Sequence, residues 1–272
     1  MRYDPVKKSL GKVFNKTPYL RILLYRLLDL LLLRSWYVRK EIKKWVKTAP
    51  ENSSVLDAGS GFGQYVWRLS KLSKNIQITG IDVKSEQIYD CNTFFSKIGL
   101  SERVIFKEAD LTRINDFEQY NLILSIDVME HIKEDELVFS NFFNSLKKDG
   151  TLIISTPSDK GGSDAENHSD NKVAGFIDEH VRDGYNMYDL EEKLHRAGFN
   201  NVKSKYMYGI PGNIAWKLSM KYPILMLNLN KLFFIILPFY YLLTFPIALI
   251  LNILDLKLRH EKGTGLIVVA RK

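Results

Sequence analysis

The chain has almost no cysteine, and this scarcity limits its chemistry. Cys91 is the only thiol among 272 residues, so no disulfide can form within the chain, as is usual in a reducing compartment. Cys91 lies in a helix-like stretch and is expected to be a small buried residue, not a nucleophile. The sequence also shows no 20–50-residue repeat and no cleavage site after its basic first residues. Neither a solenoid nor a secretory signal peptide is therefore predicted.

Acidic residues are scarce in two segments that flank an acidic middle. Residues 1–47 hold 13 Lys or Arg against 3 Asp or Glu, residues 203–262 hold 8 against 2, and residues 48–202 hold 16 against 26. A nucleic-acid enzyme more often carries its basic residues around the catalytic pocket, so no nucleic-acid partner is expected. Basic residues next to apolar runs favour contact with an anionic membrane surface, the alternative being that they only solubilise the protein.

Charge is missing altogether from residues 232–254, which are 23 in number and long enough to cross a bilayer. A strand-like apolar run at 266–270 follows and should return to the sheet, which would place both ends of the segment on one side of a membrane. Pro238 and Pro246 would break a straight helix. We therefore expect two short helices forming a hairpin that enters one leaflet, within an insertion at 211–262. A helical insertion packed on the core is the alternative.

The N-terminal segment, residues 1–50, combines leucine with basic and aromatic residues. Leu20 to Leu33 is leucine-rich but is interrupted by Arg21, Arg26 and Asp29. A mixture of basic and aromatic side chains follows up to Val46. The pattern predicts helices that either lie in a membrane interface or pack over the core, and both alternatives stay open.

Apolar runs alternate with polar, helix-compatible sequence between residues 51 and 210. A short helix at Tyr188–Ala197 and a strand at Asn201–Tyr208 follow, and residues 263–272 complete this domain. Strands separated by helices imply right-handed crossovers and a doubly wound α/β sheet. The first five expected strands are Ser54–Ala58, Ile76–Val83, Val104–Leu111, Tyr120–Val128 and Thr151–Ser155.

The strongest motif is the run Val-Leu-Asp-Ala-Gly-Ser-Gly-Phe-Gly at residues 55–63. Its three glycines allow a sharp turn and a close approach to a ligand, because they lack a Cβ atom. A dinucleotide fingerprint needs a third small residue at position 64, where this chain has Gln64. The spacing here is instead G-x-G-x-G, with Asp57 two residues before the first glycine.

This run resembles the first motif of the class I S-adenosylmethionine-dependent methyltransferases, and the Glu-His-Ile sequence at 130–132 is similar to their small-molecule, type 11-like branch. The resemblance implies a Rossmann-like, seven-stranded, mostly parallel sheet with an antiparallel last strand inserted between the fifth and sixth. The N-terminal helices and the helical apolar insertion would be additions to that fold. The insertion interrupts the final hairpin, and either edge of the sheet could carry it.

The resemblance and the carboxyl ends of the expected strands together predict the site of S-adenosyl-L-methionine. Asp57 would face the cationic methionyl end, Asp82 the ribose hydroxyls and Asp110 the adenine. The predicted cofactor-binding residues are Asp57, Gly59, Ser60, Gly61, Gly63, Asp82, Val83, Asp110, Leu111 and Asp127.

Candidate catalytic residues are His131, His180 and Tyr185, which could remove a proton from the acceptor. His131 could equally serve only to cap or pack a helix. Asp127, Glu130 and His131 match the spacing of a metal-associated set in quinone-ring O-methyltransferases, but metal-free relatives share that spacing, so no metal is predicted. The polar residues 155–178 could form a lid, or only a surface loop.

The sequence therefore predicts a methyltransferase that acts on a lipophilic or lipid-linked small molecule. It would be peripheral or monotopic on the cytoplasmic side of a membrane. A non-catalytic membrane-associated scaffold that retains the fold is the main alternative. A nicotinamide-dependent oxidoreductase is disfavoured by Gln64, and a nucleic-acid amino-methyltransferase by the lack of an Asn/Asp-Pro-Pro-aromatic signature after the fourth strand.

Overall fold

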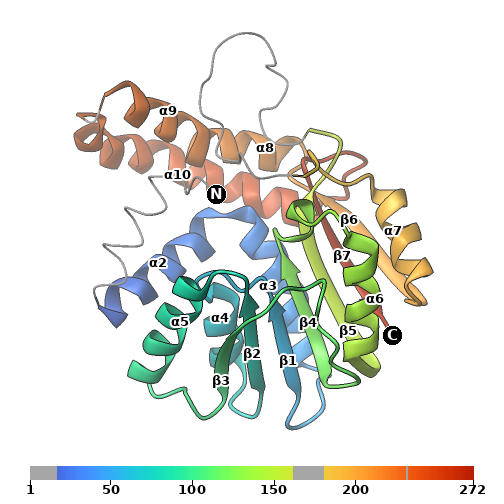
Figure 1. Cartoon of the computed structure of the whole chain (residues 1–272). Coiled ribbons are helices and arrows are strands. Elements are labelled where there is room, and N and C mark those ends of the chain that lie inside the picture. The colour runs from blue at the N-terminus through green and yellow to red at the C-terminus, as the bar shows by residue number, and fades with distance from the viewer. Residues whose placement is uncertain (1–16, 162–180, 231) are drawn as a thin grey trace.

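A computed structural model describes residues 17–161, 181–230 and 232–272. Its centre is a seven-stranded sheet in the order β3-β2-β1-β4-β5-β7-β6 (Figure 1). β7 is antiparallel to both its neighbours, while the other paired strands run parallel. This confirms the predicted fold class. The strands are β1 Ser54–Ala58, β2 Gln77–Asp82, β3 Val104–Glu108, β4 Tyr120–Ile126, β5 Leu146–Pro157, β6 Asn201–Met207 and β7 Gly265–Arg271.

Helices cover both faces of the sheet and enclose two apolar cores. Helices α3 (Leu33–Val46), α4 (Gln64–Leu72) and α5 (Ser85–Lys97) cover one face. Helices α6 (Asp135–Ser145) and α7 (Met187–Arg196) cover the other. Strands buried on both sides explain the near-continuous apolar runs in the sequence.

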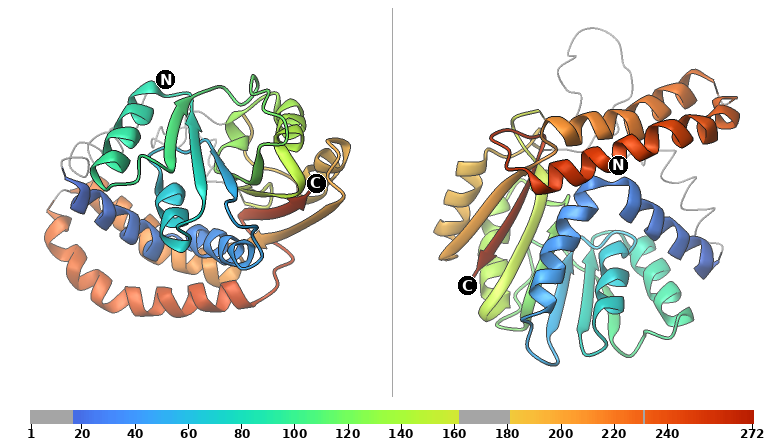
Figure 2. Two further views of the ribbon diagram at one scale, coloured as in Figure 1. Left: turned by 90° about the horizontal axis from the view of Figure 1, so that it is seen from below. Right: turned by 180° about the vertical axis from the view of Figure 1, so that it is seen from behind.

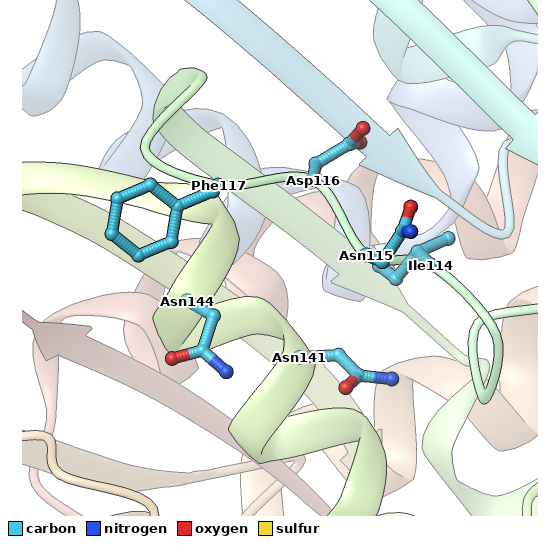
Figure 3. A pocket seen from close by; sticks show the side chains of 6 residues that line it. All are labelled: Ile114, Asn115, Asp116, Phe117, Asn141 and Asn144. Carbon is cyan, nitrogen blue, oxygen red and sulfur yellow. The ribbon is translucent and has the colours of Figure 1, made fainter.

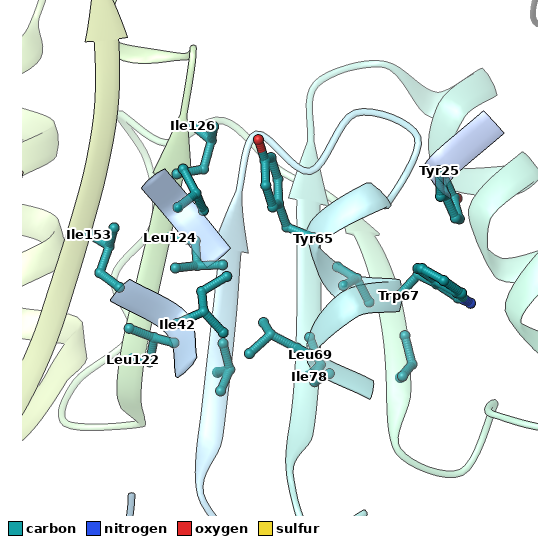
Figure 4. Close-up of a cluster of buried hydrophobic side chains, with 14 of the residues drawn as sticks. Tyr25, Ile42, Tyr65, Trp67, Leu69, Ile78, Leu122, Leu124, Ile126 and Ile153 are labelled. Atoms are coloured by element: carbon teal, nitrogen blue, oxygen red, sulfur yellow. The ribbon is translucent and has the colours of Figure 1, made fainter. Parts of the chain in front are cut away.

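The N-terminal segment divides into two helices with different environments. In α3, Tyr37, Ile42 and Trp45 are buried in the first core, and Figure 4 shows Ile42 beside Leu122 and Ile153 of the sheet. Packing over the core, one of the two alternatives, therefore describes α3. Helix α2 (Pro18–Leu31) is different, because two of its three buried residues, Arg21 and Asp29, are charged, and only Tyr25 belongs to the first core.

The apolar insertion forms a helical hairpin, but with other boundaries than predicted. A single 25-residue helix, α10 (Phe233–Lys257), contains both Pro238 and Pro246, so the expectation of two short helices within residues 232–254 is wrong. Tertiary contacts hold α10 together despite the cost of about 3 kcal/mol that an interior proline imposes. Its partners in the hairpin are α8 (Ile210–Trp216), a short π-helical segment at Lys217–Lys221 and α9 (Tyr222–Leu229).

The sheet topology determines where this hairpin lies. β6 runs parallel to β5, so its last residue is at the carboxyl edge of the parallel strands, and antiparallel β7 begins at the same edge. Both ends of the hairpin therefore meet the sheet at its carboxyl edge, where ligands bind in such folds. Figures 1 and 2 show α8–α10 lying across that end of the molecule.

A buried carboxylate, Asp255, joins the hairpin to α3. Its Oδ1 accepts the Tyr37 hydroxyl at 2.7 Å, and its Oδ2 accepts the Gly212 backbone N–H at 2.9 Å. The ring of His260 lies 3.2 Å from Oδ2. The Asp255 side chain is fully buried, and the Gly212 N–H depends on it for a partner, whereas Tyr37 and His260 also contact the Asp255 backbone carbonyl, each at 2.9 Å.

We expect Asp255→Ala to lower the free energy of unfolding by about 1–3 kcal/mol, because it leaves the Gly212 N–H buried and unpaired and removes one of the two acceptors of the Tyr37 hydroxyl. Urea denaturation followed by tryptophan fluorescence measures this. Glu261→Ala, at an exposed acid of the same segment, is the matched control and should change stability by less than about 0.5 kcal/mol. Equal stability of the two variants would contradict the role given to Asp255.

Candidate functional site

The glycine-rich turn links β1 to α4 and is rigidly placed. Gly59, Gly61 and Gly63 have φ values of +82°, +51° and +79°, which glycine adopts without strain. A Cβ atom on Gly59 would also lie 2.3 Å from a methyl carbon of Val128. The backbone N–H groups of Gly59 and Ser60 both donate to the Ile81 carbonyl, at 2.9 and 2.8 Å. The turn therefore depends on glycine and is fixed to the end of β2.

Asp82, at the end of β2, holds the turn from the other side. Its Oδ2 accepts the Gly61 N–H and its Oδ1 accepts the Lys84 N–H, each at 3.0 Å. The carboxylate thus lies beside the turn, as the resemblance requires of an acid that reaches the ribose. Val83 follows with an exposed side chain.

Asp57 is the most unusual residue of the site. It is 1% exposed, and its Oδ2 has no hydrogen-bond partner. Burial, and secondarily the charge of Asp82, raises the pKa of Asp57 to about 7. A buried carboxyl oxygen without a donor is costly, and a ligand that brings a cation to this position would relieve the cost. The observation therefore suits the sulfonium and ammonium groups of S-adenosylmethionine.

Three serine hydroxyls of this region are also buried without a partner. The Ser60 hydroxyl lies in the turn, and those of Ser125 and Ser155 lie near the carboxyl ends of β4 and β5. Ser60 was predicted. Ser125 and Ser155 were not, although a polar residue inside an otherwise apolar strand is a signal that sequence reasoning could use.

The predicted adenine end of the site lies after β3. Asp110 accepts the backbone N–H and the hydroxyl of Thr112, at 2.9 and 2.8 Å, and these bonds lower the pKa of Asp110. Its side chain is about half exposed, so the carboxylate stays ionised and accessible. The Leu111 side chain is buried in the second core, which leaves its backbone as the part able to meet a ligand.

Asp127, after β4, forms an ion pair with Arg34 of α3. Asp127 has φ +54°, and its backbone N–H donates to the Ser155 carbonyl at 2.8 Å. The Arg34 backbone N–H in turn donates to the Tyr208 hydroxyl at 3.0 Å, at the base of the hairpin. Sequence reasoning missed Arg34, because nothing distinguishes it from the other basic residues of the N-terminal segment.

Glu130 and His131 lie in a short 3-10 turn, Met129–His131, at the same edge. Glu130 is buried and accepts the Thr156 hydroxyl at 3.0 Å, and burial raises its pKa. His131 is exposed. Among the residues described, no group of three or more His, Cys, Asp or Glu side chains is placed to hold a metal ion.

The second catalytic candidate region is only partly described. His180 and residues 162–178 of the predicted lid lie outside the described residues. Tyr185 is buried, with its hydroxyl donating to Asp135 Oδ2 at 2.7 Å, and burial is the main cause that raises its pKa. Lys193 also donates to Asp135, at 2.9 Å. These contacts favour a structural role for Tyr185 rather than proton transfer.

A separate hollow, drawn in Figure 3, lies outside this site. Its lining comes from residues 114–117, which precede β4, and from Asn141 and Asn144 of α6. Asn144 is at the end of α6 that leads into β5, so this hollow lies toward the amino end of the strands. It does not include the glycine turn or its acids.

Known proteins with similar sequences include several methyltransferases. A family model described as "Methyltransferase domain" matches residues 50–212. Phosphoethanolamine N-methyltransferase 1 of Triticum aestivum is 29% identical over 152 residues, which are 54% of this chain and 28% of that enzyme. Ubiquinone biosynthesis O-methyltransferase of Rickettsia prowazekii is 23% identical over 174 residues, or 61% and 66% of the two chains. The chain thus spans less than a third of the plant enzyme's length.

Solved structures with the same fold include enzymes of different chemistry. Phosphoethanolamine N-methyltransferase 2 of Haemonchus contortus, in complex with S-adenosyl-L-methionine, has a TM-score of 0.58 at 16% identity, covering 87% of this chain and 52% of that one. The [4+2]-cyclase SpnF has a TM-score of 0.56 at 19% identity, covering 86% and 80%. Such a likeness shows the fold and not the reaction. The matched model, which spans more than half of the sequence, shows that the chain belongs to the methyltransferase-domain family.

Proposed function

We propose that this protein uses S-adenosylmethionine to methylate a lipophilic or lipid-linked small molecule at the cytoplasmic surface of a membrane. The observation that carries the proposal is the position of the apolar hairpin. It leaves and rejoins the sheet at the edge that carries Asp57, Asp82 and Asp127. A membrane contact made by the hairpin would therefore bring that edge close to a lipid-dissolved acceptor.

The residues of the turn supply a suitable cofactor site. Asp57 would face the cationic end of S-adenosylmethionine, the glycines would lie beneath it, and Asp82 and Asp110 would bind the ribose and adenine. The cofactor supplies an activated methyl group on a sulfonium leaving group. The protein's contribution is then to hold donor and acceptor in line and to exclude water. His131, exposed at the end of β4, is our candidate to accept a proton from the acceptor.

The surface of α10 supports a lipid environment. The helix has a mean hydropathy of 2.3 over its most apolar window, and only 11% of that window is buried. A core helix of a soluble protein can be equally long and apolar, but such a helix is mostly buried. Leu242 and Leu243 are 74% and 73% exposed. An apolar surface of this extent is typical of a membrane or protein interaction site.

The two ends of the hairpin argue for insertion into one leaflet over a full crossing. α8 starts at the end of β6, and α10 is followed within eight residues by β7. Both ends are thus held at the same sheet edge. Exposed basic residues, Lys217, Lys257, Arg259 and Lys262, flank the apolar surface and suit anionic headgroups. One relative, named for ubiquinone biosynthesis, is consistent with a lipophilic acceptor, whereas the plant relative is named for phosphoethanolamine, a water-soluble molecule.

We expect Asp57→Asn to weaken S-adenosylmethionine binding by at least about tenfold, because a charge-assisted contact to the cation is lost. Isothermal titration calorimetry measures the affinity. Asp149→Asn, at an exposed residue near the amino end of β5, is the matched control and should bind like the wild type. Unchanged affinity of Asp57→Asn would mean that the cationic end binds elsewhere.

Cofactor affinity of the wild type should also depend on pH. Because the pKa of Asp57 is about 7 in the ligand-free protein, the ionised fraction rises from pH 6 to pH 8, and we expect affinity to improve by about tenfold over this range. Asp57→Asn should abolish that dependence.

The same pKa makes a prediction about stability. The folded-state pKa lies above the unfolded value, so the stability that Asp57 contributes is present below about pH 4 and is lost as the pH rises through about 7. Ligand-free Asp57→Asn should therefore melt at a higher temperature than the wild type at pH 8, with the difference shrinking at pH 5. Thermal unfolding at the two pH values tests the sign.

The membrane contact predicts that Leu243→Glu reduces binding to vesicles of anionic phospholipid by about tenfold or more, since a buried leucine contributes about 1.5–3 kcal/mol and a carboxylate is repelled. Vesicle co-flotation measures the bound fraction. Leu137→Glu, which makes the same change at an exposed leucine of α6, should bind like the wild type. Equal flotation of the two variants would remove α10 from the membrane contact.

A further inference from the structure

Helix α2 buries charged side chains and exposes leucines, which is the reverse of an ordinary surface helix. Arg21, Tyr25 and Asp29, spaced four residues apart on one face, are buried. Leucines at 23, 27 and 30 are exposed on the other side, and Tyr19 is 85% exposed. A surface helix of a soluble protein turns its apolar face inward. The arrangement of α2 therefore calls for a second partner on its outer face.

The buried face of α2 holds the cofactor turn. Arg21 Nη2 donates to the Phe62 carbonyl at 2.9 Å, and the Tyr25 hydroxyl donates to the same oxygen. Arg21 Nε also donates to the Tyr25 hydroxyl at 2.8 Å, which couples the two side chains. Phe62 lies between Gly61 and Gly63, so these bonds act directly on the backbone that would lie under the cofactor.

Asp29 extends the same contact to the start of α4. It accepts Gln64 Nε2 at 3.0 Å and forms an ion pair with Arg68. Arg21 further contacts the Cys91 sulfur at 3.1 Å and stacks over the Phe94 ring at 4.7 Å. Burying a guanidinium and a carboxylate gives little net stability even when they are paired. The Tyr25 ring adds packing against Trp67 and Phe94, and a partner for the outer leucines would stabilise the docked position of α2 further.

The charges of this region identify the outer partner as an anionic lipid surface. One acid of each flanking helical segment, Asp29 and Asp255, is buried. Arg26 on the outer face of α2 is exposed, as is Lys40 of α3, whose Nζ donates to the Leu256 carbonyl at the base of the hairpin. Leucines interleaved with cations suit an interface between headgroups and acyl chains.

The position and the linkage of α2 fit this partner. Figures 1 and 2 show α2 at the same end of the molecule as the α8–α10 hairpin. A single extended residue, Leu32, with φ −91° and ψ 111°, separates α2 from α3. Because α3 is packed in the core, Leu32 can act as a hinge that lets α2 move alone.

We propose that α2 is a second membrane-contacting element, and that contact of its leucine face with an anionic bilayer holds Arg21 and Tyr25 on the glycine turn. The inference rests on the proposed function, because it assumes a cofactor in that turn and a hairpin in the membrane. Lipid and cofactor then each favour docked α2 and increase each other's affinity. Cofactor binding is thereby coupled to arrival at the membrane.

The test measures S-adenosylmethionine affinity of the full chain with and without anionic phospholipid vesicles. We expect the wild type to bind about fivefold or more tightly with vesicles, the lower end of typical couplings. The double variant Leu23→Ser/Leu27→Ser should keep vesicle flotation through the hairpin and wild-type affinity without vesicles, but lose the gain. Leu137→Ser, an exposed leucine on α6, should keep the gain.

A second measurement on the wild type does not depend on variants. Amide hydrogen exchange in residues 18–31 should slow at least about fivefold when vesicles are added. Tyr25→Phe, which retains the ring but removes the bond to Phe62, should reduce the gain in cofactor affinity.

The outcomes separate this inference from the proposed function. A wild type that floats with vesicles but shows no change in cofactor affinity or in α2 exchange overturns the coupling and leaves the proposed function intact. A gain that survives Leu23→Ser/Leu27→Ser also overturns it, because the leucine face is then not the contact. A wild type that does not float at all refutes the membrane part of the proposed function, and the coupling with it.

Discussion

The antiparallel position of β7 between β5 and β6 is the constraint that organises this molecule. Because β6 ends and β7 begins at the carboxyl edge, any residues inserted between them must emerge beside the glycine turn. The same edge receives α3, whose Arg34 reaches Asp127, and α2, which covers Phe62. Three segments far apart in the sequence thus converge where parallel strands leave room for a ligand.

Burial of polar groups at this edge lowers the stability of the ligand-free protein and leaves groups that a ligand can bind. Asp57, near the carboxyl end of β1, has one oxygen without a hydrogen-bond partner, and α2 buries the charged residues Arg21 and Asp29. Each choice makes the free protein less stable than an apolar alternative would be. Functional sites are where such violations of local rules are expected, and a ligand or a lipid surface can compensate for them.

Much of the central domain could be predicted from residues alone. Strand β1 matches its predicted bounds, and the others end within a few residues of theirs, since buried parallel strands are continuous apolar runs. β3 and β4 end two or three residues early, and β5 begins five residues before the apolar run does. The glycine turn and Asp82 lie together because adjacent parallel strands bring their carboxyl ends together, which topology guarantees before any side chain is placed.

The helices that flank the central domain were harder to predict from the sequence, for a physical reason. Proline has a local cost that predicts a break at 238 and 246, but contacts of α10 with α8 outweigh it, and those contacts are non-local. The composition of α2 is amphipathic in the ordinary way, and only the tertiary structure shows which face is inside. Arg34 illustrates the same limit, since its pairing with Asp127 requires α3 to cross the sheet edge. Hydrophobic periodicity in the sequence indicates that a helix has an apolar and a polar face. The environment on each side of the helix determines which of the two faces is buried. At α2 the inner surface combines aromatic rings, which pack around Tyr25, with hydrogen-bonding groups that pair with Arg21 and Asp29. The leucines of the other face remain exposed.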